Sequence, residues 1–420
     1  MTAAIHPARP PLQEREMIAL MALLMSLQAF GIDAMLPALG EIALEMGAQG
    51  NDRQFVIGAY FLGSGIGAFF PGAFADRFGR RPILAVALAA YITLSLACAL
   101  ATNYDLLLVL RLIQGVACAG LSVVPAAIVR DQVGGDRMAR LMSLIMMIFL
   151  LVPILAPGIG QLIMFLAGWR AIFGAMAVMG LIVGFWTWRR LPETLSAENR
   201  QDLQAANIVR NMGTALCDRG AIGYVVGSAL VFGSLFGFLN SSQQLISQTF
   251  GAGDYFFLIF GGAVVGMVLA NFTNSRIVEK FGARRVSHTA LLIFIVVSVA
   301  QYLSAGQAQQ PLWQFIILMS LSMAMLGFIG ANFGSIAMQP FFHIAGAASS
   351  AQTALRMITG AVLGALIGSL YDGSARPLAI SMLSCALLAL ALVLFSERGK
   401  LFRRAEAVQN DAADVTRTAD

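Results

Sequence analysis

Residues 72–81 read GAFADRFGRR, and residues 275–284 read SRIVEKFGAR. The two segments match at a spacing of 203 positions, and each follows a long apolar run. Each joins basic residues to a glycine that permits a sharp turn of the backbone. Matching segments at equivalent places predict a chain built from two related halves. The matched pairs are Asp76 and Glu279, Arg77 and Lys280, Phe78 and Phe281, Gly79 and Gly282, and Arg81 and Arg284.

The composition is that of a membrane protein. The 420 residues are 58% hydrophobic and 12% charged, and the mean hydropathy is +0.78. Soluble domains carry about 25% charged residues, and a membrane-spanning helix needs about 20 apolar residues. We therefore predict twelve spans. They cover residues 17–39, 54–74, 83–101, 105–129, 138–166, 170–188, 220–246, 254–275, 286–304, 313–338, 345–371 and 376–396.

A long polar segment divides these runs into six and six. We predict an N-terminal segment (1–16), a six-helix bundle (17–190), a linker or short surface helix (191–219), a second bundle (220–396) and a tail (397–420). With a cytoplasmic N terminus, 22 of the 27 Lys and Arg lie on the cytoplasmic side, which satisfies the positive-inside rule. This orientation predicts that both termini are cytoplasmic. Repeated halves are typical of secondary transporters, whose sites lie between the halves.

One carboxylate interrupts the first apolar run, in GIDAMLPAL (31–39). An intramembrane charge costs between about 2.5 and more than 10 kcal/mol, so such residues usually face a cavity or a partner and have a function. Removal from water favours the protonated acid. Asp33 is therefore predicted to bind the transported proton. The alternative is a permanently ionised Asp33 in a structural ion pair.

Arg111 is the predicted partner of Asp33. At 1.5 Å per residue, Asp33 lies about 24 Å and Arg111 about 21 Å from the cytoplasmic side of the membrane. Movement of Arg111 between two states would change the proton affinity of Asp33. Alternatively, Arg111 holds its helix to neighbouring backbone carbonyls.

The predicted cargo site combines polar and aromatic side chains from several spans. Arg356 in SSAQTALRMITG would attract anionic, zwitterionic or electron-rich cargo if it faces the site, or else it packs between helices. Each amide is either a cargo contact or a bond between helices. The candidates are Ser26, Phe30, Gln114, Phe236, Asn240, Gln243, Gln244, Phe328, Asn332, Gln352 and Arg356.

Several motifs together resemble one transporter family. GAFADRFGRRPIL (72–84) looks like the loop signature of the major facilitator superfamily, and RLIQGVACAG (111–120) resembles its fourth-helix motif. The chain differs from the general antiporter motif in the fifth helix, because 141–157 contains no glycine. The narrower match is similar to the bicyclomycin and chloramphenicol resistance family of drug–proton antiporters. Its motifs are DAMLPAL (33–39), PILAPGIG (153–160), GWRAIF (168–173) and LPET (191–194).

The resemblance implies the major facilitator fold, which is an all-α integral membrane protein of twelve transmembrane helices in two pseudo-symmetric six-helix bundles. It also implies that the 72–81 loop acts as a conformational latch in a bacterial inner-membrane protein. The latch residues are Gly72, Asp76, Arg77, Gly79, Arg80 and Arg81.

We predict proton-coupled export of small amphiphilic compounds, such as phenicols or bicyclomycin-like antibiotics, by alternating access. The alternatives are a proton symporter that imports a metabolite and a receptor without transport. The predicted partners are cargo, protons and the lipid bilayer, without nucleic acid, and the predicted oligomeric state is a monomer. The sequence carries no phosphate-binding loop and no histidine pairing typical of a metal or catalytic site. We therefore expect no enzyme activity, no metal and no cofactor, with the proton gradient as the energy source.

Overall fold

The computed structural model describes residues 12–49, 51–133, 135–195, 200, 213, 218–307 and 309–402. The surface helix predicted within 191–219 lies almost entirely outside these residues, as do most of the N-terminal segment and of the tail. All regular secondary structure in the described residues is helical.

The N-terminal half contains six membrane-crossing units, and several of them are broken. The first unit joins α1, η1 and α2, and the second joins α3 and α4 across a bend of 45°. The helices are α1 (Glu14–Asp33), η1 (Leu36–Ala38), α2 (Leu39–Met46), η2 (Asp52–Gln54), α3 (Phe55–Gly67), α4 (Pro71–Phe78), α5 (Arg80–Ala99), α6 (Tyr104–Gln132), α7 (Gly135–Phe149), α8 (Val152–Ala167) and α9 (Trp169–Arg190).

The C-terminal half supplies another six units. Its helices are α11 (Arg219–Gln244), η4 (Leu245–Thr249), η5 (Gly253–Tyr255), α12 (Phe256–Phe281), α13 (Ala283–Ala305), α14 (Leu312–Met338), η6 (Gln339–Ile344), α15 (Ala345–Ser369) and α16 (Arg376–Ser396). Eleven helices of the described chain are long and apolar enough to cross a membrane, or twelve with the bent pair counted as one span. The predicted all-helical membrane fold is confirmed.

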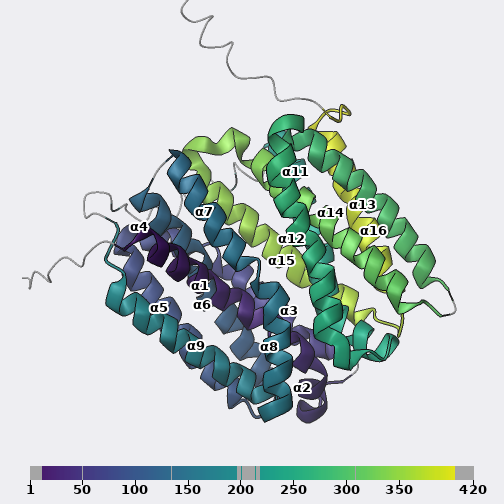
Figure 1. Ribbon diagram of the computed structural model, residues 1–420, viewed down its shortest axis with the longest axis horizontal. Helices are drawn as coiled ribbons and strands as arrows, with labels where there is room; N and C mark the ends of the chain where they lie inside the picture. Colours follow the sequence, from purple (N-terminus) through teal and green to yellow (C-terminus); the bar gives the residue numbers. More distant parts are fainter. Residues whose placement is uncertain are drawn as a thin grey trace, which may run out of the picture.

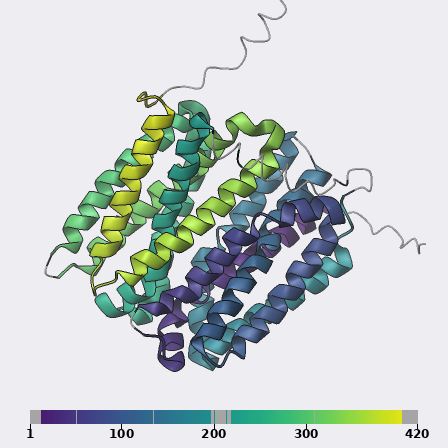
Figure 2. The same cartoon turned by 180° about the vertical axis from the view of Figure 1, so that it is seen from behind.

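The two halves lie side by side along the long axis of the molecule (Figure 1). The same division appears from behind, where α1 to α9 form one group and α11 to α16 the other (Figure 2). Large apolar side chains remain exposed on α5, α9, α12 and α16, where lipid would cover them. Polar side chains such as Asp33, Arg111 and Asn240 are instead buried inside the molecule.

Within each half, a glycine allows close backbone contact between two helices, and the two contacts are at equivalent places. A Cβ atom on Gly63 of α3 would lie 2.0 Å from the carbonyl oxygen of Leu112 on α6. Gly266 of α12, 203 positions later, stands in the same relation to the carbonyl of Ser320 on α14, at 2.5 Å. No larger residue fits either position without moving a backbone. This shared packing supports an internal duplication.

The repeated loops turn in the same way. Gly79 has φ +104° and Gly282 has φ +85°, a region that favours glycine, and each ends one helix and begins the next. An acidic residue that follows the sixth span of each half binds the junction. Glu193 accepts hydrogen bonds from the backbone N–H groups of Arg80 and Arg81, at 2.9 and 3.1 Å. These junctions define what we call the basic end of the molecule.

Candidate functional site

The first span breaks at Asp33. Pro37 has no N–H to donate to the carbonyl of Asp33, so a regular helix cannot continue through this point. The N–H of Met35 bonds the carbonyl of Ile32 at 3.3 Å, in place of the Gly31 carbonyl that an α-helix would require. The predicted first span, 17–39, is therefore too short, because the span extends to Met46 with a break in its second half.

Arg111 of α6 occupies this break. Its Nη2 donates to the carbonyl oxygen of Gly31 at 2.9 Å, which replaces the helical bond that Gly31 lacks. Its Nε donates to the carbonyl of Val56 on α3 at 3.2 Å. The guanidinium also stacks on the Tyr60 ring, with 4.3 Å between Cζ and the ring centroid. Arg111 therefore holds α1, α3 and α6 together.

Asp33 itself is 4% exposed. Among the described residues no cation lies within ion-pair distance of its carboxyl group, so the expected pairing with Arg111 is absent from this structure. The predicted similarity in depth is nevertheless consistent with the bond from Arg111 to Gly31. α8 passes close to the break, because a Cβ on Gly160 would lie 2.0 Å from the carbonyl oxygen of Ala34.

The other cargo candidates of the N-terminal half are buried. Gln114 accepts from Arg111 at 2.8 Å and donates to Ser95 at 2.8 Å, so it belongs to the same polar cluster as Arg111. Ser26 donates to the carbonyl of Ala22, within its own helix. Phe30 is 7% exposed and packs in the apolar core.

In the C-terminal half, α11 and α15 pack in a regular register. Successive turns of α11 meet successive turns of α15 at positions separated by four residues. Toward the C-terminal ends of the two helices the contact is so close that the residues of α15 that face α11 are glycines. The meeting pairs are Phe232 with Arg356, Phe236 with Gly360, and Asn240 with Gly364.

Arg356 lies where α11 and α15 are further apart. Its Cζ is 4.8 Å from the centroid of the Phe232 ring. An intramembrane arginine costs at least about 2.5 kcal/mol, whereas a cation–π contact stabilises by about 0.5 to 2 kcal/mol. In the described part of the chain, Phe232 is the only partner found for this guanidinium. The ring contact alone therefore does not offset the burial of the charge.

The remaining C-terminal candidates form two groups. Asn332 donates to Asn274 at 2.7 Å and to the carbonyl of Phe328, as a bond between α14 and α12 would require. Asn240 donates to the carbonyl of Phe236 at 2.9 Å, but its buried Oδ1 has no partner in the structure. Gln352, one turn before Arg356, has a buried Nε2 for which the described part of the chain offers no partner.

Gln243 and Gln244 lie between the two halves. Gln244 bonds Gln54 and donates to Asn51 at 2.7 Å. Gln243 accepts from Arg53 at 3.0 Å. Loop residues of the first half also bind the end of α15, since Asn51 donates to the carbonyls of Ser369 and Tyr371 and Gln54 donates to that of Gly368. We call this set the clasp. It consists of Asn51, Arg53, Gln54, Gln243, Gln244, Gly368, Ser369 and Tyr371.

The clasp closes the end of the molecule opposite to the basic end. Its hydrogen bonds join the loop that follows the first span to the C-terminal ends of α11 and α15. Gln161, in the second half of α8, adds two bonds to the backbone carbonyls of Gly253 and Asp254. The sequence analysis identified two glutamines of the clasp as cargo candidates but missed its other members. A signal was available only in their polarity next to span ends.

The predicted latch residues interact within the first half. Arg80 is buried and binds both Asp76 and Asp131, the latter at 2.9 Å through Nε. Arg81 donates to the carbonyl of Trp188 at 3.1 Å. Gly79 supplies the turn, while Arg77 lies against the ring of Phe78. Gly72 leaves room beside Val123 of α6.

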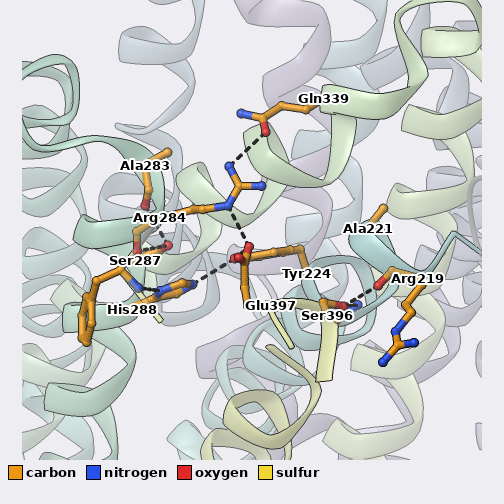
Figure 3. A network of polar contacts seen from close by, with 12 residues as sticks. Arg219, Ala221, Tyr224, Ala283, Arg284, Ser287, His288, Gln339, Ser396 and Glu397 are labelled. Atoms are coloured by element: carbon orange, nitrogen blue, oxygen red, sulfur yellow. Dashed lines mark hydrogen bonds and ion pairs between the residues drawn. The ribbon is translucent and has the colours of Figure 1, made fainter. Parts of the chain in front are cut away.

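A second polar network occupies the basic end of the C-terminal half (Figure 3). Tyr224 donates to Glu397 at 2.6 Å and contacts Nε2 of His288 at 2.9 Å. Arg284 donates to the same carboxylate at 2.7 Å. Burial raises the pKa of Glu397, but the hydrogen bonds from Tyr224 and Arg284 and the charge of Arg284 lower it further, so that its pKa lies below the ordinary value. Sequence reasoning missed this network.

Comparison with known proteins places the fold. The model of the Major Facilitator Superfamily matches residues 20–365. A bicyclomycin resistance protein homolog from Haemophilus influenzae is 28% identical over 379 residues, which cover 90% of this chain and 95% of the relative. Multidrug resistance protein MdtL from Klebsiella pneumoniae is 30% identical over 370 residues, which cover 87% and 91%.

Solved structures agree in fold. The crystal structure of a D-xylose-proton symporter superposes with a TM-score of 0.71 at 15% identity, over 93% of this chain and 100% of the other. The human organic anion transporter MFSD10 gives a TM-score of 0.62 at 18% identity, over 92% and 100%. At these identities the likeness concerns the fold alone.

Fold and matches together define a multi-pass membrane transporter of small molecules and not an enzyme. The chain belongs to the major facilitator superfamily. The predicted resemblance to the bicyclomycin and multidrug resistance transporters is confirmed by its relatives.

Proposed function

We propose that the protein exports small amphiphilic compounds across a bacterial inner membrane in exchange for protons, as a monomer. The names of the two resistance relatives support the export of drugs. The concentration of Lys and Arg at the basic end supports a cytoplasmic position for that end and for both termini. The clasp would then join the two halves at the outer face.

The proton site is Asp33, and the position of this side chain is the main support for proton coupling. The side chain is buried at a break in the first span, without a cation partner among the described residues. A carboxyl group in such surroundings binds a proton more readily than one in water. Protonation from outside would release cargo there, and loss of the proton to the cytoplasm would prepare the site for new cargo.

Arg111 is the proposed coupling partner, because its movement between two states would change the proton affinity of Asp33. In this structure its hydrogen bonds go to neutral acceptors, which are the carbonyls of Gly31 and Val56 and the amide oxygen of Gln114. We assign the 72–81 loop the role of a latch. The Asp76–Arg80–Asp131 cluster would exchange partners when the basic end closes. Both halves would rotate about the close contact between α3 and α15, where a Cβ on Gly65 would lie 2.7 Å from the side chain of Ile358.

The direction of coupling tests the proposal. Proteoliposomes are loaded with chloramphenicol and a pH-sensitive dye, and are then diluted into cargo-free buffer. Antiport requires that the lumen acidifies as cargo leaves, whereas symport makes it more alkaline. This sign is independent of how the protein is oriented in the vesicle.

Asp33→Asn should give no pH change above that of protein-free vesicles, because the amide cannot carry a proton. Glu41→Gln serves as the matched control, since Glu41 is an exposed acid of α2 on the same span. Alkalinisation of the lumen in the wild-type vesicles would refute antiport. Full coupling in Asp33→Asn would refute the role of that residue.

A further inference from the structure

Arg356 continues a row of glycines on α15. Gly360, Gly364 and Gly368 follow it at intervals of four residues, so all four positions share one face of the helix. At Gly360 a Cβ would lie 1.6 Å from the Phe236 ring, and at Gly364 it would lie 2.3 Å from Asn240. The two helices are in tight contact there. One turn earlier the same face carries an arginine, so α11 and α15 must separate at that point.

Arg356 lies too far from either end of α15 for its side chain to extend easily to water at a membrane surface. It is the twelfth of the 25 residues of α15, and lies about 17 Å along the helix from the nearer end. The guanidinium contacts the Phe232 ring, and no carboxylate or other acceptor of the described residues binds it. A cation held in this way is available to an anion from outside the protein.

Gln352 provides a second, independent observation. This side chain is 6% exposed, and its Nε2 has no hydrogen-bond acceptor among the described residues. It lies one turn before Arg356, on the same face of α15. A Cβ built on Gly334 of α14 would lie 3.9 Å from this nitrogen. A buried amide donor without a partner is costly unless a ligand completes it.

The aromatic neighbours connect this place to the first half of the chain. The ring centroids of Phe232 and Phe236 are 6.5 Å apart, and Phe236 lies 4.0 Å from Phe61 of α3. The row of three rings therefore leads from Arg356 to the contact between the two halves. Cargo in this fold class binds at that contact. An amphiphile would place its apolar part on the rings and its polar group on the two donors.

We infer that Arg356 and Gln352 bind an anionic oxygen group of the cargo, so that the preferred substrates are amphiphiles that carry a carboxylate or phosphonate. A guanidinium and an amide one turn apart on the same helix face offer donors that match the acceptor oxygens of such a group. A dication would be repelled. This inference rests on the proposed function, because it specifies the substrate class of the same transporter.

The experiment compares three related probes on the purified full-length protein. Chloramphenicol is neutral, its hemisuccinate carries one carboxylate at pH 7, and the methyl ester of the hemisuccinate is neutral and nearly equal in size. Equilibrium dialysis in detergent measures the three dissociation constants. The hemisuccinate should bind at least about ten-fold more tightly than its ester, which corresponds to about 1.4 kcal/mol.

Variants assign the preference to the site. Arg356→Gln should reduce the ratio to near one, and Arg356→Lys should keep part of it. Arg376→Gln removes the same charge from an exposed position at the start of α16 and should keep the full ratio. If Arg356→Gln does not remain monodisperse, Gln352→Ala replaces it and should lower the ratio while chloramphenicol binding is retained.

The inference is overturned if the wild type binds the hemisuccinate no better than its ester, or binds neither compound. It is also overturned if the preference survives in Arg356→Gln. These outcomes are separate from the fate of the proposed function. Proton-coupled export of neutral chloramphenicol without an anion preference would support antiport and refute the anion site. A preference for the anion without proton coupling would support the anion site and refute antiport.

Discussion

Arg111 donates a hydrogen bond to the carbonyl oxygen of Gly31 at 2.9 Å, two residues before Asp33 on the same helix. The bond exists because the helix breaks at this point and leaves the carbonyl without its usual donor. The break, the arginine and the acid thus form one local unit. Its backbone geometry ties the arginine to the helical turn that carries the acid, and does so without an ion pair.

Loss of the Arg111 guanidinium should destabilise the first half. Arg111→Gln leaves the buried carbonyls of Gly31 and Val56 without their donor, at about 1 to 3 kcal/mol each. We expect a clear fall in the unfolding temperature of the detergent-solubilised protein. Arg170→Gln is the control, because Arg170 lies in a half-exposed pair with Glu45 that contributes about 0 to 1 kcal/mol. Equal effects of the two changes would show that Arg111 does not hold the helices together.

The proposed antiport predicts a definite electrical signature. Exchange of a neutral cargo for one proton moves one positive charge inward per cycle, and exchange of a monoanion moves two. Each charge contributes about 2.3 kcal/mol per 100 mV of membrane potential. A potassium diffusion potential that makes the vesicle interior negative should therefore accelerate the export of chloramphenicol hemisuccinate more than the export of chloramphenicol. The rates at several potentials give the charge moved, and equal slopes for the two compounds would contradict the prediction.

The clasp depends on a glycine at the end of α15. A Cβ on Gly368 would lie 0.9 Å from Oε1 of Gln54, so Gly368→Ala cannot keep the present contact. We expect this variant to favour states in which the clasp end is open. Spin labels at positions 49 and 372 report the separation of the two halves, and their distance distribution should shift to longer values.

Gly262→Ala is the matched control for the clasp. Gly262 lies in α12, and a Cβ there has no neighbour within 4 Å. Its distance distribution should equal that of the wild type. An unchanged distribution in Gly368→Ala would mean that Gln54 moves aside without opening the clasp, and that the glycine is not needed for closure.

The fold could be predicted from the sequence because hydrophobicity alone determines which segments enter the membrane. Asp33 and Arg111 were identifiable for the same reason, since a charge within an apolar run is conspicuous. The break after Asp33 was harder to predict. Pro37 signals it, but Glu41 and Glu45 made the apolar run seem to end before the second part of the span.

The partners of these residues could not be predicted. Arg111 binds backbone carbonyls, and a carbonyl becomes available only through the local break in a helix. Gln244 resembles a cargo contact in sequence, yet it meets loop residues of the other half. Glu193 and Glu397 each follow the sixth span of their half and bind the repeated loop. That pairing depends on tertiary packing, although the near-equal spacing of the two acids was visible in the sequence.

The Glu397 network should make stability depend on pH in one direction. The folded pKa of Glu397 is lowered, so its contribution is complete above the unfolded pKa of about 4.3 and disappears as the pH falls through the lower folded value. At pH 7, Glu397→Gln should reduce the unfolding free energy by about 1 kcal/mol or more, because the bonds from Tyr224 and Arg284 lose their charged acceptor. Unfolding temperatures of the wild type and Glu397→Gln should therefore differ at pH 7 and converge below pH 4. A difference that grows as the pH falls would contradict this assignment, since it would require a carboxyl group that is protonated in the folded protein.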